Sequence, residues 1–152
     1  MIYKICQVID GEYVCDIDIS VEEWKNLLMN EKVFDSKSIE ALKKWYIEPN
    51  HSCTCFDIGK KYDQHSMSAN GVINGLGGRV QKELGRFEVK GIGNIAPGTK
   101  FITVMKSKET GEKPKRYLWT IRDELVQAIK ELDLFGVEEI TINEYYSDDE
   151  LI

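Results

Sequence analysis

The fold is decided by residues 54–84, TCFDIGKKYDQHSMSANGVINGLGGRVQKEL. Thr54 followed by Asp57 is typical of a capping box at the start of a short helix. After a polar turn, Ser68 is placed to cap a second helix over 69–84. The apolar residues of this second segment recur at helical spacing: Val72, Ile73, Leu76, Val80 and Leu84. The stretch therefore predicts two helices joined by a short turn.

Residues 1–19 predict a β-hairpin that extends the fold at its N-terminal side. Asp10-Gly11 is a typical two-residue hairpin turn, and it places Cys6 opposite Cys15. A cross-strand disulfide is one interpretation of this pair. In a reducing cytosol, two small buried hydrophobic side chains are the other, and the sequence favours this second interpretation.

Two helices and a short strand are predicted between the hairpin and the central stretch. Ser20 and Glu23 form a capping-box pattern before a helix over 21–30. A second amphipathic pattern covers 36–46, and an apolar stretch near 52–55 predicts a short strand.

The C-terminal part of the sequence predicts two more strands, a helix and a last strand. A glycine-rich loop is expected over 85–99, and a strand over 101–105 leads into a polar basic tip at 106–115. The chain then returns as a strand over 116–121. Thr120 and Asp123 are expected to cap a helix that Gly136 terminates. A weak strand over 137–146 and an acidic tail over 147–152 complete the prediction.

This order of elements is that of a winged helix-turn-helix: helix, short strand, helix, turn, helix, strand, tip, strand and helix. The predicted fold class is α+β, with a winged helix-turn-helix core over 20–135, the added N-terminal hairpin and a C-terminal helix and strand. Residues 1–146 are predicted to form a single domain, since a chain of 152 residues is long enough for one self-sufficient core.

Charge is distributed unevenly along the chain. The whole protein has a formal net charge of -6, yet residues 59–117 carry 12 Lys and Arg against five Asp and Glu. This central segment is therefore +7 and the flanks together are -13. A positive field concentrated on one face attracts phosphate even when the total charge is negative. The segment coincides with the predicted recognition helix and tip, so a nucleic-acid interface is predicted there.

The candidate nucleic-acid-binding residues fall into two groups. From the predicted recognition helix, the side chains suited to base edges or phosphates are Ser68, Asn70, Asn74, Arg79 and Lys82. From the basic tip, the side chains suited to the phosphate backbone are Lys106, Lys108, Lys113, Lys115 and Arg116. The first group would contribute specificity and the second affinity.

Other motifs carry less chemistry. Asn74 to Gly78 places three glycines in the predicted recognition helix, so either that helix is broken or a backbone or ligand approaches it closely. The cluster His51, Cys53 and Cys55 lacks the spacing of common zinc sites, and no metal or cofactor is predicted. Trp24, Trp45 and Trp119 lie on apolar stripes and are expected in the core.

The sequence also resembles a known family of small domains. The residues that carry the resemblance are Trp24-x-x-Leu27-Leu28, Ser52-x-Thr54-Cys55-x-x-Ile58-Gly59-Lys60-Lys61-Tyr62, Asn70, Gly78-Arg79-Val80 and Tyr117 to Leu125. Together they are similar to the N-terminal domain of modification-dependent restriction proteins of the 5-methylcytosine type, including those attached to McrB-like AAA+ GTPases or HNH nucleases. The resemblance implies a DNA-facing module in bacterial or phage defence.

The expected function is a non-catalytic nucleic-acid-binding module that contacts duplex DNA. The sequence holds no Gly-x-x-x-x-Gly-Lys-Ser/Thr loop, neither His51 nor His65 lies in a nuclease motif, and no catalytic residues are predicted. The alternative is an acidic protein-interaction module, a phage-type inhibitor or adaptor, whose acidic ends occupy a partner's nucleic-acid groove. A cytoplasmic location without membrane contact is expected, because no signal peptide or apolar span is evident.

Overall fold

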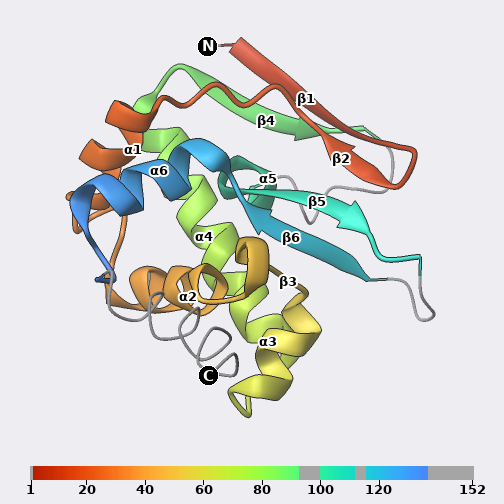
Figure 1. The fold of residues 1–152 in the computed structure, drawn as a ribbon. Coiled ribbons are helices and arrows are strands. Elements are labelled where there is room, and N and C mark those ends of the chain that lie inside the picture. Colours follow the sequence, from red (N-terminus) through yellow and green to blue (C-terminus); the bar gives the residue numbers. More distant parts are fainter. Residues whose placement is uncertain (1, 93–99, 112–115, 137–152) are drawn as a thin grey trace, which may run out of the picture.

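The computed structural model describes residues 2–92, 100–111 and 116–136, which form one mixed sheet with helices packed around it (Figure 1). The strands are β1 (Ile2–Ile9), β2 (Glu12–Val14), β3 (Ser52–Cys53), β4 (Phe87–Gly91), β5 (Met105–Glu109) and β6 (Tyr117–Ile121). The helices are α1 (Val21–Leu28), α2 (Ser36–Tyr46), α3 (Cys55–Lys61), α4 (Ser66–Leu84), α5 (Phe101–Val104) and α6 (Asp123–Leu132), with a 3-10 turn, η1 (Pro49–His51), before β3. The predicted α+β class is confirmed.

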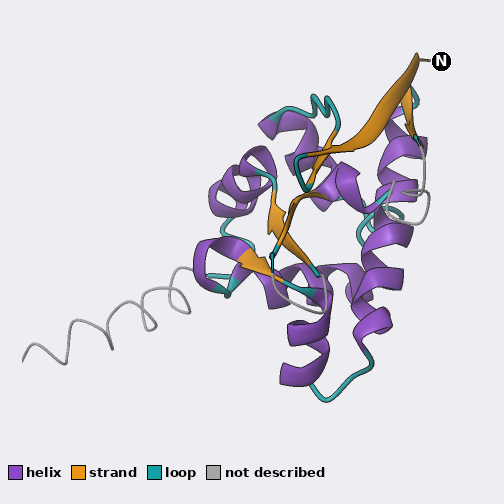
Figure 2. Cartoon of the chain, turned by 90° about the vertical axis from the view of Figure 1, so that its right-hand side faces the viewer, coloured by secondary structure: helices purple, strands orange, loops and turns teal. Residues whose placement is uncertain are grey.

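The six strands lie in the order β3-β6-β5-β2-β1-β4. All neighbours pair antiparallel except β1 and β4, which are parallel. The predicted hairpin register is confirmed, because Val8 pairs with Tyr13 across a turn in which Asp10 and Gly11 both have positive φ. The hairpin supplies two strands to the interior of the sheet, since β1 and β2 lie between β4 and β5. The N-terminal end of β1 projects beyond the helices (Figure 2).

Strand β4 lies inside the segment expected to be a loop. The flanking Gly85 and Gly91 resemble loop punctuation, but Phe87 and Val89 are buried and alternate with the more exposed Glu88. The strand is held by parallel pairing with β1, more than 80 residues away in sequence. A local pattern does not reveal such a partner, and the loop prediction was wrong at 87–91.

The predicted strand over 101–105 is a short helix for most of its length. All four residues of α5 are buried, and the helix packs against α4. A short, fully buried apolar run fits a helix or a strand equally well on periodicity alone. The strand begins at Met105, so Lys106 and Lys108 belong to β5 and not to a tip.

Most predicted helix starts are confirmed. The Ser20 and Glu23 capping box is present at α1, and Thr54 accepts the N–H of Asp57 at the start of α3. Helix α4 begins at Ser66, so Ser68 lies within its first turn and does not precede it. The capping box expected from Thr120 is absent, because Thr120 is part of β6 and its hydroxyl shares a 2.7 Å hydrogen bond with Ser52.

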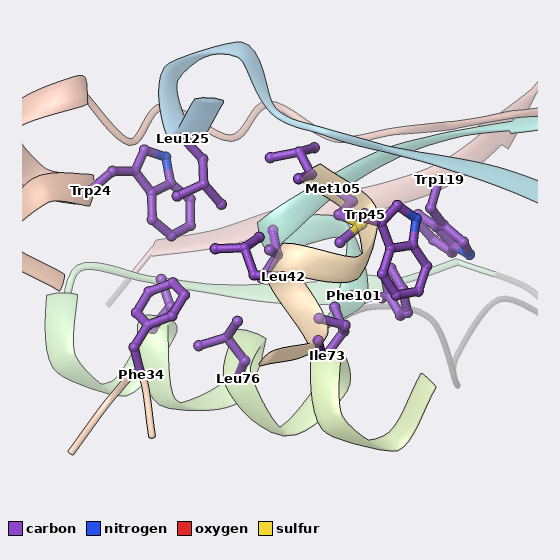
Figure 3. Close-up of a cluster of buried hydrophobic side chains, with 14 of the residues drawn as sticks. Trp24, Phe34, Leu42, Trp45, Ile73, Leu76, Phe101, Met105, Trp119 and Leu125 are labelled. Carbon is purple, nitrogen blue, oxygen red and sulfur yellow. The ribbon is translucent and has the colours of Figure 1, made fainter. Parts of the chain in front are cut away.

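The core lies between the sheet and the helices and holds all three tryptophans, as predicted (Figure 3). Trp24 of α1 lies close to Leu125 of α6. The ring centroids of Phe101 and Trp119 are 4.1 Å apart, and Trp45 meets Phe101 edge to face. This aromatic cluster joins α2, α5 and β6, and it fixes the position of the β5–β6 hairpin relative to the helices.

Several of the expectations from the sequence lie outside the described residues. These are the strand over 137–146, the acidic tail over 147–152, and the tip lysines Lys113 and Lys115. Within the described ranges, no helix has both the length and the apolar character needed to cross a membrane.

Candidate nucleic-acid interface

Helix α4 presents one exposed stripe, which we call the α4 face and define as Ser68, Gly71, Gly75 and Lys82. These residues recur at helical spacing, so they share one side of the helix, and the partly exposed Arg79 and the exposed Glu83 border the same stripe. The opposite side is formed by core residues at the predicted positions Ile73, Leu76 and Val80, all 0% exposed. Of the five candidate residues on this helix, Ser68 and Lys82 therefore lie on the open side.

Asn70 and Asn74 lie off the α4 face and bond to each other. The amide Nδ2 of Asn74 donates to Oδ1 of Asn70 at 3.2 Å, and both side chains are half-buried. The carboxamide oxygen of Asn74 is buried and has no hydrogen-bond partner among the described residues. The two asparagines therefore form a local pair at the side of the helix.

Arg79 connects α4 to the start of α2. Its guanidinium donates to the Val33 carbonyl at 2.9 Å and to the Ser38 hydroxyl at 2.7 Å. Asp35, which caps α2, lies 3.8 Å from the same group. These bonds engage Arg79 within the protein, so its position is that of a packing residue and differs from the base-contacting role expected for it.

The glycines of α4 do not break the helix. A Cβ on Gly77 would lie 2.0 Å from the Lys100 carbonyl oxygen, and one on Gly78 would touch the Lys100 side chain. The backbone at Lys100 therefore crosses α4 in close contact, which is one of the two explanations that the sequence left open. By contrast, nothing lies within 4 Å of a Cβ built on Gly71, which is part of the α4 face.

The β5–β6 hairpin carries exposed basic residues on its outer side. Lys106 and Lys108 are exposed while Ser107 between them is buried, as the alternation of a strand requires. Lys106 is 3.7 Å from Asp123, and both partners are largely exposed, so this pair is weak. Lys108 has no ion pair within the described part of the chain and is paired in the sheet with Leu118.

Arg116 links this hairpin to α3. Its guanidinium lies 3.9 Å from the centre of the Phe56 ring, which is 43% exposed. Lys60 follows Phe56 by one helical turn and is also exposed. Phe56 and Lys60 were not among the predicted site residues, although their i,i+4 spacing on a predicted helix was visible.

The cysteine and histidine cluster before α3 is structural. His51 donates from Nδ1 to the Tyr46 carbonyl at 2.7 Å and its ring stacks on that of Tyr46. Burial raises the pKa of Cys53 to about 11 and that of Cys55 to about 12, so both thiols are protonated at neutral pH. No three His, Cys, Asp or Glu side chains within the described ranges are grouped to hold a metal ion.

Comparison of the chain with protein-family models, curated proteins and solved structures gives no match. The positions and contacts of the residues described above are therefore the basis for assigning a function.

Proposed function

We propose that the protein is a non-catalytic duplex-DNA-binding module with a winged helix-turn-helix core, acting in bacterial or phage defence. The observation that carries the proposal is the arrangement of α2, β3, α3, α4, β5 and β6. They follow one another in the order expected for that fold, and β3, β6 and β5 are adjacent in the sheet in that order. Strand β4 and helix α5 are an insertion between the third helix and the hairpin.

The α4 face is the part of this arrangement proposed to enter a groove. Gly71 has no side chain and open surroundings, so the helix backbone can approach the groove walls closely there, whereas the Arg79 guanidinium lies beside Gly75. Ser68 can donate to or accept from a base edge or a phosphate, and Lys82 can pair with a phosphate at the far end of the stripe. No ion pair occupies Lys82 among the described residues.

The β5–β6 hairpin is proposed to contact the DNA backbone beside that groove. Lys108 lies on the exposed side of β5. Arg116 is held over Phe56 on α3, and α3 packs against α4. Lys60 therefore lies on a helix that packs against α4, and Arg116 lies against the same helix; positive charge there adds affinity without sequence preference.

Fluorescence anisotropy of labelled duplexes, unmodified and cytosine-methylated, tests the proposal. Neutralising about four phosphates gives a loss of affinity of about a hundredfold between 50 and 200 mM salt. A preference for methylated duplex would support the defence role. Absence of binding at low salt would contradict DNA binding altogether.

A protein-interaction module is the second candidate function, and one observation favours it. Large apolar side chains are exposed on and around β1, β2 and β4: Ile2, Tyr3, Ile5, Val8, Ile9, Val14 and Ile92. Neighbouring residues of a strand point to opposite faces of the sheet, so these side chains expose apolar area on both faces of this part of the sheet, and such area is typical of protein contacts. Replacing Lys108 with Glu distinguishes the two functions, because it should weaken DNA binding and leave a contact at these apolar residues intact.

A further inference from the structure

A buried cation, Arg122, acts electrostatically on Cys6 and Cys15 of the N-terminal hairpin region. Arg122, at the junction of β6 and α6, is 8% exposed. Its guanidinium donates from Nε and Nη2 to a single acceptor, the Ile102 carbonyl, at 2.9 and 2.6 Å. Within the described residues no carboxylate pairs with it. A buried charge without a paired counter-ion is costly, so groups that bring negative charge close to it matter.

The Cys15 thiol is one such group, and the Glu124 carboxylate is another. Burial lowers the pKa of the Arg122 guanidinium, and Cys15 raises it more than any other group does. The pKa of the Cys15 thiol is lowered, first by its interaction with the Cys6 thiol and then by the positive charges of Arg122 and Lys4. Burial of Cys15 and the carboxylate of Asp16 raise this pKa, but by less than the other groups lower it.

Cys6 is placed to react with Cys15. Gln7 pairs with Val14 at the end of the antiparallel ladder, and Cys6 and Cys15 are the residues directly beyond this pair. Facing residues of such a ladder have Cα atoms about 4.5–5.5 Å apart, a separation that a disulfide can bridge. Cys6 is 2% exposed whereas Cys15 is half-buried, so Cys15 is the thiol of this pair that an oxidant from solution can reach. Both thiols are free in the structure.

We propose that Cys15 is the peroxide-reactive thiol of this region and Cys6 its resolving partner, so that the two form a reversible disulfide. Cys15 gives up its proton and its sulfur attacks one oxygen of hydrogen peroxide, which breaks the O–O bond. The sulfur becomes a sulfenic acid, and the other oxygen leaves as hydroxide and takes up the released proton to form water. The Cys6 sulfur then attacks the Cys15 sulfur and displaces a second water. One peroxide is reduced to two waters, and two thiols are oxidised to one disulfide.

The other cysteine pair provides an internal control. Cys55 is half-buried like Cys15, but burial and Cys53 raise its pKa to about 12, and no cation lowers it. With equal access, the thiolate fraction decides the rate of attack. Cys15 should therefore react much faster than Cys55 in the same molecule.

The test oxidises the full reduced chain with one equivalent of hydrogen peroxide at pH 7, blocks the remaining thiols and maps the peptides by mass spectrometry. We expect a Cys6–Cys15 cross-link that a reducing agent reverses, with Cys15 consumed at least about tenfold faster than Cys55. Cys6→Ser should stop at a sulfenic acid on Cys15 that dimedone traps. Cys15→Ser should leave Cys6 unreacted.

The role of the cation is tested by the pH profile of Cys15 alkylation. Arg122→Met should move the midpoint of that profile upward by about one pH unit, which slows the reaction about tenfold at pH 7. If circular dichroism shows that this variant does not fold, Lys4→Met takes its place with a smaller upward shift. Equal reactivity of Cys15 and Cys55, or an unchanged profile in the folded variant, would overturn the proposal.

Discussion

At the scale of single residues, Gly77 is the position in α4 with the least room. The Lys100 carbonyl oxygen occupies the place of its missing Cβ. Gly77→Ala should therefore lower the free energy of unfolding by about 2–3 kcal/mol, although alanine is the better helix former. Urea denaturation measures this change.

Gly71 provides the matched control in the same helix. Its surroundings are open, so only helix propensity changes on substitution. Gly71→Ala should raise the free energy of unfolding by about 0.5–1 kcal/mol. If both substitutions stabilise the protein to the same extent, the Lys100 backbone does not pass as close to Gly77 as described here.

Arg79 is the candidate site residue whose role the structure changes most. Arg79→Met removes the bonds to Val33 and Ser38 and should lower the free energy of unfolding by about 2 kcal/mol. DNA affinity should stay within about twofold at a temperature where the variant is folded.

Lys82→Met removes the same charge from the same helix without removing a described bond. It should leave the free energy of unfolding unchanged within about 0.5 kcal/mol and reduce the salt dependence of DNA binding by about one phosphate contact. If instead Arg79→Met abolishes binding while Lys82→Met does not, Arg79 faces DNA and our assignment of its role is wrong.

At the scale of elements, α1 is connected to the start of β4 through a partly exposed ion pair between Glu23 and Arg86. Burial alone would raise the pKa of Glu23, but Arg86 and the Ser20 backbone N–H hold it below its ordinary value of 4.5. Because the folded pKa is lower than the unfolded one, this stabilisation is fully present above about pH 4.5 and is lost as pH falls through the folded value.

Glu23→Gln isolates this effect, since glutamine still completes the capping box. The substitution should lower the free energy of unfolding by about 0.5–1 kcal/mol at pH 7, a value kept small because solvent screens the pair. At pH 3 the two proteins should converge. Urea unfolding at both pH values measures this, and an equal difference at both would show that the charge of Glu23 contributes nothing.

The elements that the sequence predicts well are those determined by local chemistry. The α2 bounds, the Thr54 cap of α3 and the hairpin register all follow from caps, turn residues or helical spacing within a few positions. Strand β4 and helix α5 depend instead on distant partners, namely β1 and α4. Their short sequences are compatible with several conformations, and tertiary contacts select one.

At the scale of the whole molecule, the charge pattern predicted a nucleic-acid interface within residues 59–117, but it did not predict which side chains there are free to bind a ligand. The helix spacing that identified the core of α4 also defines its opposite side, so Ser68 and Lys82 could be assigned to the surface. The sequence could not predict the inward bonds of Arg79 or the pairing of Asn70 with Asn74, because each depends on how neighbouring groups are arranged in space.

The central claim is that duplex DNA binds across the α4 face and the β5–β6 hairpin. The measurement that tests it most directly is the anisotropy titration of one duplex with two double variants of equal charge change. Lys82→Glu with Lys108→Glu reverses charge on the proposed surface. Lys32→Glu with Lys130→Glu reverses charge at exposed positions after α1 and on α6, and these lysines have no ion pair among the described residues.

We predict that the first variant loses about a hundredfold in affinity at 100 mM salt and that the control stays within about fivefold of the natural protein. Equal losses in the two variants would show only a general electrostatic attraction and would contradict a specific interface at α4 and the hairpin.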